Sequence, residues 1–142
     1  MSKKDAGELL EDQQEQPQYE QDAYLPDCWV IVRLSGSDIG ETYYRILAGW
    51  YGGFAGSDAW RLSSGITTVK EYEGHYKIKN ESGSIYICKK QYERLSSLTA
   101  SVLAGYGYKK PEELLVERVG IKDVPQGVYL EWFSNASREI SK

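Results

Sequence analysis

The segment Cys28–Leu34, with the sequence CWVIVRL, is the feature that most constrains the fold of this chain. Its apolar residues occupy both odd and even positions, whereas a strand with one face in water alternates apolar and polar residues. A short run of this kind is typical of a strand that is covered on both faces. The sequence therefore predicts a buried strand here.

Further short runs with strand character follow and are separated by glycine-containing turns. This spacing is typical of an antiparallel meander. One of the predicted strands is interrupted at Ser63–Gly65, where an internal glycine favours a bulge or a bend. The predicted strands after the first are 42–50, 60–62 continued by 66–72, 75–80, 84–90 and 128–133.

The pattern changes to helical spacing within residues 91–108, where Gly105 supplies a C-terminal stop. Residues 111–121 are ambiguous, because Pro-Glu-Glu suits the start of a helix while LLVERV suits an edge strand. We therefore expect an α+β fold: an antiparallel β-meander of about five to six strands, in a curled sheet or partial barrel, with one main helix packed on it. The helical positions are Tyr92, Leu95, Thr99, Val102 and Leu103.

Acidic residues are concentrated at the N-terminus. Residues 1–24 contain two lysines and seven Asp or Glu, a net charge of −5, whereas the whole chain carries −4. The remaining residues therefore sum to +1, which gives no electrostatic footprint for sequence-independent DNA binding. Residues 1–25 are interpreted as a disordered acidic tail, which either solubilises the protein or docks on a basic partner, and 26–142 as a single α+β domain.

Composition narrows the class of protein. No apolar run is long enough to cross a membrane, and the N-terminus lacks the apolar core of a secretory signal, so we expect a cytoplasmic protein without membrane contact. Cys28 and Cys88 are expected to be packed thiols, with a disulfide as the alternative if their strands are neighbours. A single histidine and the absence of a CxxC motif exclude a Cys/His zinc cage.

Catalytic motifs are weak throughout. No G-x-S-x-G or phosphate-loop motif occurs, and no cofactor is expected. His75 lies in an alternating stretch beside Lys77, which favours a surface or half-packed histidine. Glu71 and Glu73 are interpreted as solvated charges on a strand, because nothing apolar surrounds them that would raise a pKa.

Aromatic residues carry the functional hypothesis, because tyrosine is abundant and is favoured at interfaces: the chain has twelve tyrosines against two phenylalanines. GWYGGFAGSDAWR, residues 49–61, reads as a long hairpin connection in which glycines permit positive φ. Trp50 and Trp60 are expected to pack as a cross-strand pair, with Trp60 inward and Tyr51 and Phe54 exposed at the tip. The candidate binding residues are Trp50, Tyr51, Phe54, Asp58, Trp60, Arg61 and Tyr86.

The same stretch resembles small uncharacterised accessory proteins of tailed bacteriophages. The matching pattern is A-G-W, then G-G, then D-x-W-R and S-G-I, at residues 48–50, 52–53, 58–61 and 64–66. It continues through SGSIYIC at 82–88 and GYG at 105–107, covering most of 27–133. The resemblance implies an accessory phage protein in the cytoplasm of the bacterial host, and such proteins often act in host takeover or counter-defence by binding.

The function predicted from these features is a non-enzymatic binding protein that engages a host protein through the aromatic, glycine-rich loop. The alternative is a sponge for a nucleotide signal or a small nucleic acid. A small hydrolase that uses His75 and a structural protein of the virion are further, less favoured hypotheses. The sequence leaves the oligomeric state open.

Overall fold

The strand β1 (Cys28–Ser35) lies inside a four-stranded antiparallel sheet, as its sequence predicts. The structure, a computed structural model, describes residues 23–53, 56–126 and 131–133. In this first sheet β1 pairs with β2 (Tyr43–Trp50) on one side and β7 (Leu115–Val119) on the other. β3 (Ala59–Leu62) pairs with β2 and forms the opposite edge, giving the order β3-β2-β1-β7.

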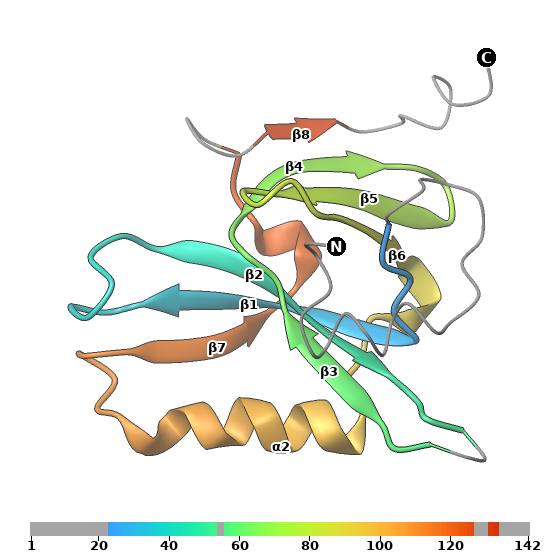
Figure 1. Ribbon diagram of the computed structural model, residues 1–142. Coiled ribbons are helices and arrows are strands. Elements are labelled where there is room, and N and C mark those ends of the chain that lie inside the picture. The colour runs from blue at the N-terminus through green and yellow to red at the C-terminus, as the bar shows by residue number, and fades with distance from the viewer. Residues whose placement is uncertain (1–22, 54–55, 127–130, 134–142) are drawn as a thin grey trace.

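A second four-stranded sheet packs across the first, with the order β6-β5-β4-β8 (Figure 1). Its strands β4 (Ile66–Glu71), β5 (His75–Asn80) and β6 (Ile85–Lys89) form an antiparallel meander. β8 (Glu131–Phe133) pairs with β4 in the parallel direction. Short 3-10 helices stand at Lys90–Tyr92 (η1), Tyr106–Tyr108 (η2) and Ile121–Asp123 (η3).

In the first sheet β1 and most of β2 are buried on both faces, because the second sheet covers one face and the helix α2 (Ser97–Gly105) covers the other (Figure 1). Trp29 and Ile31 belong to the core between the sheets. Val30 and Val32 belong to the core beneath α2. Alternate residues of β1 therefore contribute to two different hydrophobic cores, which explains why CWVIVRL is apolar at both odd and even positions.

Helix α2 begins at a capping box and lies directly on β2. The Ser96 hydroxyl accepts a hydrogen bond from the Thr99 backbone N–H at 3.1 Å, and the Thr99 hydroxyl accepts one from the Ser96 N–H at 2.8 Å. Gly49 permits the close approach: a Cβ built on it would lie 2.9 Å from both Cys28 Sγ and Thr99 Cγ2. The glycine of the A-G-W motif is thus a packing residue.

The predicted α+β class is confirmed in its coarse form, as mostly antiparallel strands with one short α-helix in the described part of the chain. The expectation of one curled sheet of five to six strands is wrong, because the described residues form eight strands that are divided between two sheets. The predicted third strand divides at Ser63–Gly65. Before this point the chain pairs with β2 of the first sheet, and after it the chain pairs with β5 of the second. Ser63 fixes this crossing: its N–H donates to Ile46 O at 2.9 Å, and its hydroxyl accepts from Ile46 N at 2.8 Å.

Three other sequence predictions are refined. The main helix is shorter than residues 91–108, since Ser96 caps it and η1 and η2 occupy the flanks. The ambiguous segment contains β7, an edge strand. The register of β4 shifts between Ile66 and Thr68, next to the predicted bulge. Residues 1–22 lie outside the described residues, while Ala23 and Tyr24 are buried and Tyr24 pairs with Tyr86 of β6.

Cys28 and Cys88 are both buried free thiols, as predicted. They lie on opposite faces of the first sheet, because Cys28 faces α2 beside Gly49 while Cys88 belongs to the core between the sheets. Burial raises the pKa of the Cys88 thiol well above its ordinary value. In the described part of the chain, no helix has the length and apolar character needed to span a membrane.

Gly49→Ala is predicted to lower the free energy of unfolding by about 1–3 kcal/mol, because the new methyl group would overlap Cys28 and Thr99. Gly74→Ala is the matched control, since a Cβ there would meet nothing within 4 Å and its φ is not positive. That variant should stay within about 0.5 kcal/mol of the wild type. Urea unfolding followed by circular dichroism measures both, and equal effects would contradict the packing role of Gly49.

Candidate functional site

The hairpin that joins β2 to β3, residues 50–61, is called the aromatic hairpin here; it projects past the first turn of α2 (Figure 1). At its base Trp50 is buried in the core between the sheets. The Trp50 indole N–H donates to Leu25 O at 3.0 Å, and its ring meets that of Tyr24 edge-on at 6.4 Å. Because its donor is satisfied and its ring is enclosed, Trp50 supports the hairpin from below.

Carboxylates hold the backbone of the aromatic hairpin. The Tyr51 N–H donates to Asp27 Oδ2 at 2.8 Å, and the Gly52 N–H donates to Asp58 Oδ1 at 3.0 Å. A Cβ at Gly52 would lie 2.3 Å from Ser57 O, so only glycine fits where the two arms approach. Gly53 has φ of +69°, as predicted for a glycine in this connection. Asp58 thus shapes the loop, and Phe54 lies outside the described residues.

Trp60 and Tyr51 form the exposed part of the aromatic hairpin, with 42% and 46% of their surfaces accessible. The expectation that Trp60 faces inward is wrong, and so is its cross-strand pairing with Trp50. The register places Trp60 opposite Gly49 and Trp50 opposite Ala59, so the two indoles lie on opposite faces of the first sheet. Trp60 faces the α2 side at an edge strand, where no further strand of the described chain covers it.

Arg61 and Tyr86, the other two candidates, are tied to the base of the aromatic hairpin. The Arg61 guanidinium lies 5.1 Å from the centroid of the Tyr24 ring, in cation–π geometry. Tyr86 is 1% exposed, and its ring packs against the same Tyr24 at 4.8 Å. Since neighbouring strand residues point to opposite faces, Arg61 and Trp60 face away from each other. The site residues therefore separate into an exposed pair and a buried support.

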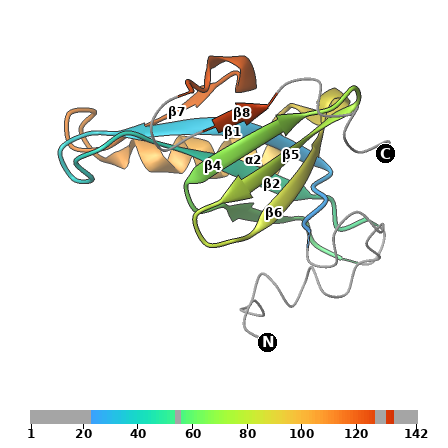
Figure 2. The same ribbon diagram turned by 90° about the horizontal axis from the view of Figure 1, so that it is seen from above.

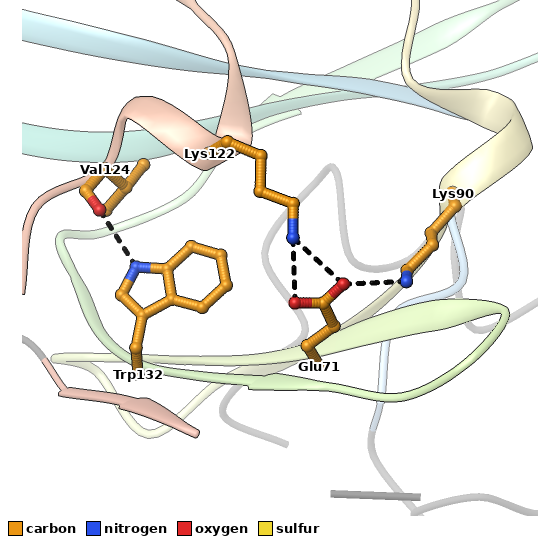
Figure 3. A network of polar contacts seen from close by, with 5 residues as sticks. All are labelled: Glu71, Lys90, Lys122, Val124 and Trp132. Carbon is orange, nitrogen blue, oxygen red and sulfur yellow. Dashed lines mark hydrogen bonds and ion pairs between the residues drawn. The ribbon is translucent and has the colours of Figure 1, made fainter. Parts of the chain in front are cut away.

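A second polar cluster, which the sequence did not reveal, surrounds Glu71 at the end of β4 (Figure 3). Lys90 Nζ donates to Glu71 Oε2 at 2.8 Å, and Lys122 Nζ donates to Oε1 and Oε2 at 2.8 and 2.9 Å. Both ammonium groups also lie near the ring of Tyr76, with Lys90 Nζ 5.2 Å and Lys122 Nζ 5.6 Å from its centroid. Trp132 completes the cluster, with Lys122 Nζ 5.6 Å from its centroid.

The cluster around Glu71 ties η1 and η3 to the second sheet. The interpretation of Glu71 as a solvated charge is wrong, because only 16% of its side chain is exposed and both oxygens are paired. Hydrogen bonds from Lys122 and Lys90 lower the pKa of the Glu71 carboxyl, and the bond to Glu71 raises the pKa of Lys122. A carboxylate held this way is a poor general base, and a fully protonated lysine is a poor nucleophile.

His75 is half-buried, as predicted, and stacks on the ring of Tyr72 at 4.7 Å. Burial, followed by the charges of Lys90, Lys89 and Lys77, lowers the pKa of its imidazole below the ordinary value of 6.5. The lowered pKa favours the neutral form of the ring. Within residues 23–53, 56–126 and 131–133, no group of three His, Cys, Asp or Glu is placed to hold a metal ion.

Comparisons with protein-family models, with curated proteins and with solved structures found no match to this chain. The site therefore rests on its own geometry. Its supporting residues were partly visible in the sequence, through the A-G-W motif and Asp58. The partners of Glu71 had no sequence signal, because Lys90 and Lys122 are 19 and 51 positions away along the chain.

Glu71→Gln is predicted to lower the free energy of unfolding at pH 7 by about 1 kcal/mol, because the charge-assisted bonds to two lysines are lost. The pKa of Glu71 is lower in the folded state than its ordinary value of 4.5. The stabilisation is thus complete above that value and disappears as the pH falls through the folded pKa. Denaturant unfolding between pH 3 and pH 8 should show the wild type and the variant converging at the acid end.

Glu73→Gln serves as the control, since Glu73 is an exposed residue in the connection between β4 and β5, two positions after Glu71. Its stability profile should follow the wild type at every pH. A Glu71→Gln difference that persists unchanged at pH 3 would contradict the ion-pair assignment.

Proposed function

We propose that this chain is a non-enzymatic binding protein that engages a partner protein through the aromatic hairpin. The observation that carries the proposal is the exposed pair of Tyr51 and Trp60 on one projecting hairpin. Tyr and Trp are enriched in the energetically dominant residues of protein interfaces. A rigid base favours such a role, because little side-chain and loop entropy is lost on binding.

The position of Trp60 on β3 adds a second means of recognition. β3 is an edge strand of the first sheet, and among the described strands only β2 pairs with it. An extended partner segment can add to such an edge through main-chain hydrogen bonds, with side-chain contacts supplying specificity. Trp60 is placed to provide such a contact.

The resemblance to accessory proteins of tailed bacteriophages directs the proposal toward a host protein, in the cytoplasm of an infected bacterium. Such accessory proteins often act in host takeover or counter-defence by binding. The resemblance is an association, so the partner class rests on it alone, whereas the binding surface rests on the hairpin geometry.

Nucleotide binding stays the alternative hypothesis. It predicts a concave pocket lined by Tyr, Trp and Arg, and the placement of Trp60 and Arg61 on opposite faces of β3 gives it less support than protein binding. Calorimetry against cyclic and linear nucleotides tests it directly, since binding in the micromolar range would favour it over the proposed function.

Trp60→Ala is predicted to weaken partner capture by at least 100-fold while leaving the circular dichroism spectrum unchanged, because the exposed indole supplies contact area and little packing. Affinity capture from bacterial lysate, followed by mass spectrometry, identifies the partner. Titration of the purified pair by calorimetry then gives the change in affinity. Tyr51→Ala should also weaken binding of the partner.

Tyr108→Ala is the matched control, since Tyr108 is an exposed aromatic of η2, outside the hairpin, with 77% of its surface accessible. It should capture the partner as the wild type does. Equal loss in the Trp60 and Tyr108 variants, or unfolding of the Trp60 variant, would overturn the assignment of the hairpin as the binding site.

A further inference from the structure

The free edge of β3 presents two residues whose main-chain groups point away from the first sheet. The Ser63 N–H donates to Ile46 O at 2.9 Å, so these two residues form a hydrogen-bonded pair between β3 and β2. Such pairs recur at every second position of an antiparallel ladder. Arg61 therefore directs its N–H and C=O toward β2, whereas Trp60 and Leu62 direct theirs toward the side that no described strand occupies.

The outward main-chain groups of Trp60 and Leu62 have no hydrogen-bond partner among the described residues. Gly49, which lies opposite Trp60, accepts a hydrogen bond from the Asp27 N–H on the side away from β3, in agreement with this ladder. A helix cannot pair with the free groups, because its own N–H and C=O groups are bonded internally. An extended segment can, because it offers main-chain groups at alternate residues along one edge.

The indole N–H of Trp60 differs from those of the other three tryptophans. The indoles of Trp29, Trp50 and Trp132 donate to main-chain carbonyls at 2.8, 3.0 and 2.9 Å. Within the described residues the Trp60 indole has no acceptor, and 42% of the Trp60 surface is exposed. Tryptophan at an interface offers a ring for apolar contact and an N–H for a hydrogen bond. Trp60 keeps both available to a partner.

The other edges of the two sheets are covered or protected in ways that β3 is not. Tyr24 makes two main-chain hydrogen bonds to β6, at 2.8 and 2.9 Å. β7 carries the charged residues Glu117 and Arg118, and β8 spans only three described residues. Cover, charge and short length all discourage pairing at an edge. β3 instead exposes a tryptophan, and its one charged residue, Arg61, lies over the Tyr24 ring on the other face.

The side chains of an added strand would meet Trp60 and Leu62 on the α2 side of the first sheet. Viewed from above, the second sheet lies over the first, and α2 lies behind it (Figure 2). Leu62 packs against the core beneath α2, and Trp60, two positions earlier, faces the same side. Residues directly opposite each other in an antiparallel pair point to one face. Two residues of the added strand, at positions i and i+2, would therefore contact Trp60 and Leu62.

We propose that the segment recognised by the aromatic hairpin is an extended peptide that adds to β3 as an antiparallel strand, with apolar side chains at positions i and i+2. These two residues exchange main-chain hydrogen bonds with Trp60 and Leu62 and pack on their side chains. Every strand pair within the first sheet is antiparallel, and this ladder is the more stable kind. The inference rests on the proposed function, since it specifies the form and sequence pattern of the partner segment.

Selection of short random peptides from a displayed library, on the immobilised full chain, tests the proposal. Peptides that also bind Trp60→Ala are removed, and Tyr108→Ala is the control that should retain the selected ones. The enriched peptides should share two apolar residues separated by one position and bind in the micromolar range, as expected for a small interface. No enrichment after this counter-selection, or enrichment of a helical i, i+4 pattern, would overturn the proposal.

Amide hydrogen exchange, measured by NMR with and without a selected peptide, reports the main-chain contact. The amides of Trp60 and Leu62 should exchange about tenfold more slowly when the peptide is bound, because new hydrogen bonds protect them. The Arg61 amide, already bonded to β2, should change less and serves as the internal control. Protection of Trp60 and Leu62 no greater than that of Arg61 would rule out strand addition.

N-methylated forms of a selected peptide separate main-chain from side-chain recognition. A methyl group on the amide of either apolar residue should weaken binding about tenfold or more, because that N–H faces β3. A methyl group on the amide between them should change the affinity by less than about threefold, because that N–H points away from the sheet. Equal losses at the two kinds of position would contradict the proposal.

Two other occupants of the β3 edge give distinct results. Protection of the Trp60 and Leu62 amides in the dilute protein without peptide would assign the edge to another segment of the same chain. Protection that grows with protein concentration, together with a sedimenting dimer, would assign it to a second copy. Either result overturns the proposal.

Failure of this inference and failure of the proposed function are distinguishable. A host protein captured through Trp60, with no peptide selected, would refute strand addition and leave the proposed function standing. Selected peptides without a captured host protein would refute the proposed host partner and leave the β3 edge as a peptide-binding site.

Discussion

Burial of the central strand β1 on both faces is the constraint on which the rest of the structure depends. β1 places Trp29 and Ile31 against the second sheet and Val30 and Val32 beneath α2, so neither outer layer can be removed without exposing apolar side chains. Close packing of α2 then requires glycine at position 49. One strand thus dictates a three-layer arrangement, and the glycine motif beside it follows from how near the layers approach.

The crossing at Ser63–Gly65 lets one continuous segment serve both sheets. Ser63 pairs with Ile46 through its backbone and its hydroxyl, which anchors the end of β3 before the chain turns into β4. Glu71, at the far end of β4, then accepts hydrogen bonds from Lys90 of η1 and Lys122 of η3. The second sheet is therefore held by polar contacts at its end and by apolar packing along its inner face.

The proposed binding surface depends on the same core. Trp50, Tyr24 and Tyr86 fill the space beneath the aromatic hairpin, and Asp27 and Asp58 hold its backbone. With these positions committed to support, Tyr51 and Trp60 are the described hairpin aromatics that remain exposed.

The local sequence pattern by itself determined several features of the fold. They are the strand buried on both faces, the order of the short strands, the helix around Thr99 and the glycines of the aromatic hairpin. These features follow from periodicity and backbone stereochemistry, which act between near neighbours. The division into two sheets, the parallel pairing of β4 with β8 and the ion pairs of Glu71 were decided only by the tertiary structure. The orientation of Trp60 belongs to the same group, because a two-residue period says that Trp60 and Arg61 face opposite ways but not which one faces the core. That choice is made by register: pairing with Gly49 sets Trp60 on the α2 side of an edge strand, and only contacts between distant segments establish that register.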